Sequence, residues 1–242
     1  MNRRGVMLLE LLVAVTLLSL LTTGVLLAMR VGFNATQMTN DRIIDARRVL
    51  SVQRILEQQI AGLMPVLADC QAPPFPRALR RPFFQGDPQS MRFVSTYSLG
   101  EASRGYPRIL EFQVIPGENQ EGVRLVVNEH LYTGPQSAGW FCPGTTPEGV
   151  PGGPGHYPPI QPGPGSFVLA DRLAYCRFFY REFNPPDQQR WLPVWPGITW
   201  PAGVRIEMAP MEAQASRPPL ISITAPVRVT RMPYQQYADT FQ

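Results

Sequence analysis

The stretch VMLLELLVAVTLLSLLTTGVLLAM, residues 6–29, contains a single charged side chain, Glu10, among 24 residues. As a helix rising ~1.5 Å per residue it would be ~36 Å long, which is enough to cross a hydrocarbon core of ~30 Å. Arg3 and Arg4 precede it. Because positive charges favour the cytoplasmic side, the sequence predicts a single-pass membrane helix whose N-terminus is cytoplasmic and whose remaining chain lies outside.

Two ordinary explanations fit this stretch less well. A secretory signal peptide has a shorter apolar region of ~7–15 residues that ends in an Ala-x-Ala-like site, and no such site closes the run at Ala28 and Met29. A plain membrane anchor explains the length but not Glu10, because a carboxylate in a membrane helix costs ~2.5–3.5 kcal/mol on insertion scales. We therefore expect Glu10 to be kept for a partner.

The sequence RRGVMLLELLVA, residues 3–14, resembles the cleavage and N-methylation motif of type IV pilins and type II secretion pseudopilins. The resemblance implies that residues 1–5 are a leader peptide and that a prepilin peptidase cuts between Gly5 and Val6. It also implies that the new amine of Val6 is methylated. Glu10 would then pair with the N-terminal ammonium of a neighbouring subunit during filament assembly, which neutralises both charges.

Two positions depart from the usual pattern of the family. Val6 stands where Phe is usual, and Met7 stands where Thr or Ser is usual. Neither change removes the glycine or the glutamate. The resemblance implies a protein of the bacterial inner membrane with a periplasmic C-terminal domain, which joins the pseudopilus after processing.

The membrane segment, residues 6–29, is expected to continue into an amphipathic helix over residues 30–67. Gly24 and Gly32 are expected to soften or unwind it, and Pro65 to help end it. Apolar residues recur at steps of three or four, as a helical face requires. These residues are Val52, Leu56, Ile60, Leu63 and Leu67. This face is expected to pack on the domain that follows.

The period changes from helical to two in the globular domain, residues 68–242, so we expect antiparallel strands rather than a parallel α/β sheet. The predicted strands are Met91–Tyr97, Arg108–Ile115, a run from Val123 to Val127, Phe167–Arg181, Val204–Met208 and Leu220–Val229. Each of two sheets is expected to pack on one side and to carry a polar face on the other. The fold class predicted is α+β, with the N-terminal helix packed on the β domain as in pseudopilins.

A loop rich in Pro and Gly interrupts this domain. In residues 143–165, 15 of 23 residues are Pro or Gly, which predicts a polyproline-like or disordered insertion between strands. A flexible surface loop without its own role is the main interpretation, and contact with a partner subunit or an exported substrate is the other.

The globular domain also resembles that of the large minor pseudopilins of the GspJ (PulJ) family. The positions that carry the resemblance are Phe84 and Gly86, then Met91, Phe93 and Ser95, then Leu169 to Tyr180 with Trp191, and finally Trp200 to Glu207. This implies a structural subunit at or near the pseudopilus tip that primes assembly for protein export. Its implied partners are minor pseudopilins of GspI and GspK type, the major pseudopilin and prepilin peptidase.

Two alternatives remain open. A PilW-like minor pilin of a type IV pilus, serving adhesion, motility or DNA uptake, would have the same N-terminal motif. A single-span anchored binding module or enzyme would carry the motif by accident.

The three cysteines, Cys70, Cys142 and Cys176, fit an exported domain with one disulfide. We favour Cys142–Cys176, which would staple the base of the Pro/Gly-rich loop. Cys70 with either partner and three reduced thiols are the alternatives.

Little in the sequence indicates enzymatic chemistry. All 22 basic residues are Arg, which excludes lysine-based catalysis and the P-loop lysine. The two histidines lack metal-ligand spacing, with His130 expected to face solvent and His156 lying in the Pro/Gly-rich loop. Despite the net charge of +4, no arginine cluster is interleaved with aromatic residues. We expect no enzyme activity, metal, cofactor or nucleic-acid partner.

Overall fold

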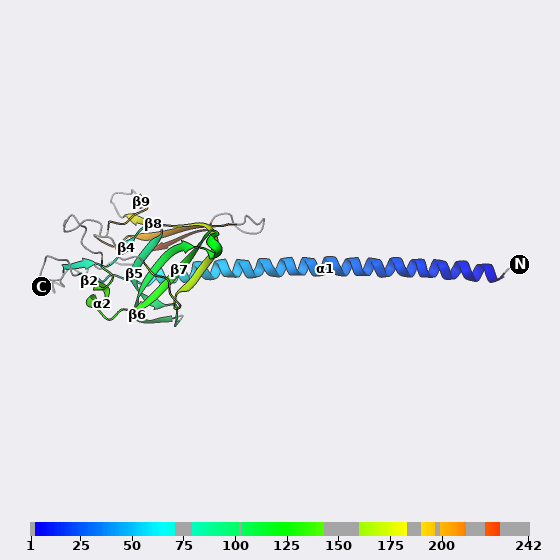
Figure 1. The fold of residues 1–242 in the computed structure, drawn as a ribbon, viewed down its shortest axis with the longest axis horizontal. Helices are drawn as coiled ribbons and strands as arrows, with labels where there is room; N and C mark the ends of the chain where they lie inside the picture. The colour runs from blue at the N-terminus through cyan, green and yellow to red at the C-terminus, as the bar shows by residue number, and fades with distance from the viewer. Residues whose placement is uncertain are drawn as a thin grey trace, which may run out of the picture. The chain divides into compact units, whose positions relative to one another are not determined.

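The computed structural model describes residues 3–70, 79–101, 103–142, 160–182, 190–196, 199–211 and 221–227. It has an α+β fold, with a long apolar helix at the N-terminus and an antiparallel sheet domain after it (Figure 1). The chain divides into two units, Met1–Val49 and Leu50–Gln242, which are described separately.

The first unit is helical throughout its described length, as part of α1, Arg3–Ala61. Residues Leu9–Thr39 have a mean hydropathy of 2.4 and are long and apolar enough to cross a membrane. The hydroxyls of Thr16, Ser19 and Thr23 donate to backbone carbonyls three or four residues earlier, at 2.7–2.9 Å. These donors are therefore satisfied within the helix, as a hydrocarbon environment requires.

The helix is continuous through Gly24 and Gly32, so the expected unwinding at these glycines is wrong. A single glycine costs about 1 kcal/mol relative to alanine inside a helix. The flanking residues are mostly strong helix formers such as leucine, and helix propagation is cooperative. Two isolated glycines are therefore too weak to interrupt the helix.

The helix ends six residues earlier than expected, at Ala61 rather than residue 67. The Gly62 carbonyl accepts a hydrogen bond from the Thr96 backbone N–H at 2.9 Å, and the Gln59 carbonyl accepts one from the Ser95 hydroxyl at 2.9 Å. The neighbouring strand thus supplies donors to carbonyls that a helix end leaves without partners. Leu63, which continued the helical spacing, instead begins a strand paired with Ser95.

All the described strands pair antiparallel. The strands are β1 Leu63–Met64, β2 Leu67–Cys70, β3 Leu79–Pro82, β4 Gln85–Gly86, β5 Ser90–Ser98, β6 Ser103–Pro116, β7 Val123–Leu131, β8 Phe167–Glu182, β9 Arg190–Leu192, β10 Gly203–Pro210 and β11 Ile221–Pro226. A nine-stranded sheet has the order β1-β5-β6-β7-β8-β10-β11, with β4 on β5 and β9 on β8, and β2 pairs with β3 in a separate two-stranded sheet. A 3₁₀ turn, Glu118–Gln120, joins β6 to β7, and the short helix α2 spans Pro135–Gly139.

The six predicted strands are confirmed as β5, β6, β7, β8, β10 and β11. The short strands β1 to β4 and β9 were not predicted, because two to four residues are too few to show a period. Strand β8 bends near Arg172, which has a φ of 54°, and pairs with β7 before this bend and mainly with β10 after it. Strand β8 therefore connects the β5–β6–β7 part of the nine-stranded sheet to the β10–β11 part.

The main core lies on one face of the nine-stranded sheet. Leu56 and Ile60 of α1 are fully buried there with Phe93 of β5 and with Leu110 and Phe112 of β6. Val52 packs against the same core and is partly exposed. The predicted apolar face of this part of α1 is thus confirmed as a packing surface.

The opposite face of this sheet is also covered over β5 and β6. Val94 and Ile109 form a second apolar cluster with Phe83, with Ala68 of β2 and with Ala138 of α2. The expectation that each sheet packs on one side only is therefore wrong at this place. Alternation along β6 indicated a polar outer face, but α2 and the β2–β3 sheet cover it.

Truncating Leu56 should show how strongly α1 depends on the main core. Leu56→Ala removes a fully buried side chain and should lower the free energy of unfolding by about 2–5 kcal/mol. Leu50→Ala removes a side chain that is 63% exposed on the same helix and should change it by less than about 0.5 kcal/mol. Urea unfolding of the full chain in detergent measures both, and equal losses would contradict the packing described.

Candidate functional site

Gly5, Val6 and Glu10, the predicted processing and assembly residues, all lie within the first turns of α1. The Glu10 side chain is exposed, and it makes no ion pair with the part of the chain that the structure describes. A carboxylate in a segment apolar enough to span a membrane is costly, and a counter-charge lowers this cost. Cleavage at Gly5, methylation of Val6 and pairing of Glu10 stay predictions.

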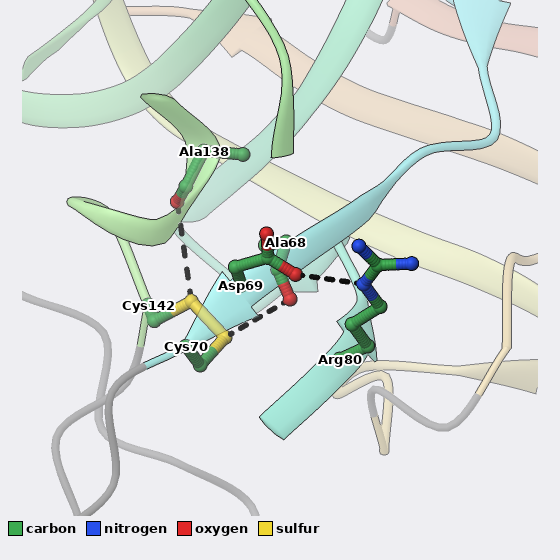
Figure 2. The surroundings of a disulfide bond; sticks show 6 residues. All are labelled: Ala68, Asp69, Cys70, Arg80, Ala138 and Cys142. Carbon is green, nitrogen blue, oxygen red and sulfur yellow. Dashed lines mark hydrogen bonds and ion pairs between the residues drawn. A yellow bond between two sulfur atoms is a disulfide. The ribbon is translucent and has the colours of Figure 1, made fainter. Parts of the chain in front are cut away.

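The disulfide joins Cys70 to Cys142, with a Cα–Cα distance of 5.5 Å (Figure 2). The predicted pair Cys142–Cys176 is therefore wrong. Cys176 lies on β8 and points into the main core, whereas Cys70 and Cys142 belong to the cluster on the opposite face of the sheet. Two cysteines on opposite faces of a sheet cannot meet without moving the backbone.

Close packing of α2 on β2 brings the two cysteines together. A Cβ atom at Gly139 would lie 2.4 Å from the carbonyl oxygen of Asp69, so only glycine permits this approach. Ala138 is fully buried beside it. On the outer side of β2, the Asp69 carboxylate forms an ion pair with Arg80 of β3 at 3.0 Å (Figure 2). The disulfide thus holds α2 against the two-stranded sheet.

A buried ion pair lies beneath this cover. Arg92 of β5 is 1% exposed, and its guanidinium contacts Oε1 of Glu111 on β6, with Nη2 at 2.6 Å and Nε at 2.7 Å. Arg92 Nη1 also donates to the side-chain oxygen of Gln85 at 2.9 Å. The second carboxylate oxygen of Glu111 accepts from Asn128 Nδ2 at 3.4 Å and lies 2.8 Å from His130 Nε2. The cluster is therefore internally satisfied, as buried charges must be.

Phe141, next to the disulfide-bonded Cys142, covers this ion pair. The Arg92 guanidinium carbon lies 5.5 Å from the Phe141 ring centre, and the His130 and Phe141 ring centres are 5.0 Å apart. The His130 side chain is 42% exposed. The expectation of a solvent-facing imidazole is therefore only half right, because one ring nitrogen contacts Glu111.

Ser166 extends this cluster, because its hydroxyl donates a hydrogen bond to the side-chain oxygen of Asn128. Among the described residues, no three His, Cys, Asp or Glu side chains are grouped so that they could hold a metal ion. His156 lies outside the described residues. The arrangement pairs buried charges, and within the described residues the hydrogen-bond partner of the His130 imidazole is Glu111.

The Pro/Gly-rich loop, residues 143–165, lies mostly outside the described residues. Its last residues contact the same cluster, because the Gln161 carbonyl accepts a hydrogen bond from Asn128 Nδ2 at 3.1 Å. Ile160 is only 5% exposed. The end of the loop is thus fixed on the domain.

Sequence reasoning missed the Arg92–Glu111 pair, the disulfide partner and an exposed set of arginines and aromatic rings on β8, β9 and β10. Within β8 the alternation of Tyr175, Arg177 and Phe179 was visible. Arg205 and Trp191 come from other strands, so their approach to Phe179 depends on strand pairing.

Comparison of the sequence with known proteins does not assign the chain to a family. No family model matches the sequence, and no significantly similar sequence was found among curated proteins.

Peptide mapping without reduction tests the disulfide. We expect a linked peptide that contains Cys70 and Cys142, together with a free Cys176. Burial raises the pKa of the Cys176 thiol to about 12, so at pH 8 it is protonated and should resist alkylation until the protein unfolds. A peptide that links Cys142 to Cys176 would overturn the pairing.

The same experiment gives a stability prediction. The bond closes a loop between cysteines 72 residues apart, and the chain-entropy model gives about 4 kcal/mol of stabilisation for a loop of this size. Cys142→Ser should lose the linked peptide and about this much unfolding free energy. Cys176→Ala, the control, should keep the linked peptide.

Proposed function

We propose that this chain is a structural assembly subunit, a minor pseudopilin of a type II secretion system that acts at or near the pseudopilus tip. The observation that carries the proposal is the position of Gly5, Val6 and Glu10 at the head of a helix with a membrane-length apolar segment. The antiparallel domain that follows supports the proposal, because pseudopilins combine an N-terminal helix with such a domain.

The energetics of Glu10 explain why assembly needs this residue. A lone carboxylate in a membrane helix costs ~2.5–3.5 kcal/mol, and this cost falls when an opposite charge approaches. Cleavage after Gly5 would create a new ammonium group at Val6, and Glu10 would be the fifth residue of the processed chain. The ammonium of one subunit can then pair with Glu10 of the next subunit. Each added subunit thus neutralises an unpaired charge of the subunit before it.

The periplasmic side of the proposal rests on the second unit. A disulfide between Cys70 and Cys142 fits a domain that folds in an oxidising compartment, with the N-terminus in the cytoplasm. The expected partners are minor pseudopilins of GspI and GspK type, the major pseudopilin, and prepilin peptidase. The domain would serve as a structural part of the filament rather than as an enzyme.

A PilW-like minor pilin of a type IV pilus is the alternative that shares the same N-terminal motif. The adjacent genes distinguish the two. Secretion-channel genes with GspI- and GspK-like genes support the pseudopilin, and a retraction motor with pilin-type neighbours supports the pilus.

Replacing the glycine tests processing. Co-expressed with prepilin peptidase, the wild-type chain should lose residues 1–5 and begin at a methylated Val6. Gly5→Leu should stay full length, because a bulky side chain at the cleaved bond blocks the peptidase. Gly24→Leu is the matched control, since a Cβ at Gly24 meets no atom within 4 Å, and it should be cut as wild type is. Intact mass and N-terminal sequencing of membrane-extracted protein decide the outcome. An uncut wild-type chain would refute the proposal.

Replacing the glutamate tests assembly. Glu10→Ala and Glu10→Gln should insert and be cleaved normally. Each should lower recovery in a complex with co-expressed GspI- and GspK-like subunits at least about tenfold, because the partner ammonium loses its buried counter-charge. Glu10→Asp keeps the charge and should retain more of the complex. If the alanine and glutamine variants assemble as wild type does, Glu10 does not have this role.

A further inference from the structure

One part of the large sheet exposes an unusual set of side chains. We define the arginine–aromatic face as the outward side chains of β8, β9 and β10: Tyr175, Arg177, Phe179, Arg181, Trp191 and Arg205. It lies on the face opposite the main core, to which Phe178 and Ile206 point. Over β5 and β6 that same outer face is covered by α2 and the two-stranded sheet. On β8 and β10, Tyr175 is 37% exposed and the Arg205 side chain 30% exposed.

The guanidinium of Arg205 lies between two aromatic rings. Its carbon is 4.9 Å from the centre of the Phe179 ring and 4.8 Å from the centre of the Trp191 ring. Strand register explains the arrangement, because Arg205 is opposite Phe179, and Trp191 is opposite Arg181 on the far edge of β8. The two ring contacts restrict the arginine side chain, and cation–π contacts of this kind leave guanidinium N–H groups able to bind an anion.

The neighbouring arginines are held in similar ways. Arg177 lies 5.8 Å from the centre of the Tyr175 ring, and Arg181 Nη2 donates to the Ala202 carbonyl at 2.9 Å. Glu207 of β10 lies beside these six residues and contacts Arg205 Nε at 3.1 Å. Three arginines against one glutamate leave a net charge of +2, so the face is short of carboxylates.

We propose that the arginine–aromatic face binds an acidic, extended polypeptide segment of a partner protein. Carboxylates of the segment contact the guanidinium edges, and its backbone and apolar atoms contact the aromatic rings. A guanidinium already restricted by stacking loses little entropy on binding, and its paired N–H donors match a carboxylate geometrically. Arg, Tyr and Trp are also the residues that contribute most at protein interfaces.

The geometry favours a polypeptide over an anionic membrane. Aromatic side chains that bind bilayers enter the boundary between headgroups and acyl chains. Here Phe179 and Trp191 contact Arg205 with their faces, so these rings are already engaged and are not free to enter a bilayer. The proposal goes beyond the assembly role of the helix and does not depend on the Gly5–Glu10 motif.

Fluorescence anisotropy with a labelled ten-glutamate peptide tests the proposal on the full chain in neutral detergent micelles at about 50 mM salt, where charges are weakly screened. Arg177→Gln/Arg205→Gln removes two charges from the face and should weaken binding roughly tenfold or more. Arg80→Gln/Arg104→Gln removes two exposed charges elsewhere and should change the affinity less than about twofold. Circular dichroism and thermal unfolding verify that each variant is folded.

Arg205→Lys separates stacking from charge. It keeps the positive charge but loses the planar fork, so we expect roughly threefold to tenfold weaker binding than wild type. Affinity equal to wild type would overturn the role of the stacked guanidinium.

Three further results would overturn the proposal. The first is no binding of the peptide to the wild-type chain, and the second is an equal loss in both double variants, which indicates net charge alone. The third uses vesicles with about one-third anionic phosphatidylglycerol, which carry the surface potential that attracts basic protein segments. If the face variant loses vesicle binding but keeps peptide binding, the face contacts lipid rather than protein.

Discussion

Leu56 and Ile60 are fully buried on one face of the nine-stranded sheet, together with Phe93, Leu110 and Phe112. This contact determines much of what surrounds it. The last turns of α1 cover the main core, and the chain then turns at Gly62 so that β1 pairs with β5. Serine and threonine side chains and backbone of β5 provide the donors that complete the helix end. Without the apolar contact, part of the main core would be exposed to water.

The other face of the sheet combines a smaller apolar cluster with a buried charge pair. Arg92 and Glu111 are almost completely buried, where hydrogen bonds satisfy their polar atoms and a covering segment lies over them. The disulfide between Cys70 and Cys142 holds that segment, and Phe141 beside it covers the arginine and His130. Phe141 and Cys142 are adjacent in the sequence. The disulfide at Cys142 therefore helps to hold Phe141 over the Arg92–Glu111 pair.

Within the described residues, α2 and the two-stranded sheet cover β5 and β6, whereas on β8 and β10 arginines contact aromatic rings on the outer face. A protein that assembles through its N-terminal helix would still have this part of the sheet available for another polypeptide. The two proposed roles would then belong to different parts of the chain. Glu10 would act in assembly within the membrane, and Arg205 would bind a partner protein outside it.

The sequence by itself determined the elements with a long, regular pattern. The apolar run with Glu10 predicted the membrane-length helix, the spacing of Leu56 and Ile60 predicted its packing face, and alternation predicted six strands. Tertiary structure alone decided where α1 ends, which cysteine bonds to Cys142, and that Glu111 is buried. The physical reason is that periodicity records which residues share a side of one element. It does not record which elements face each other, and the partners of Gly62, Cys142 and Glu111 all lie on other strands, β5, β2 and β7.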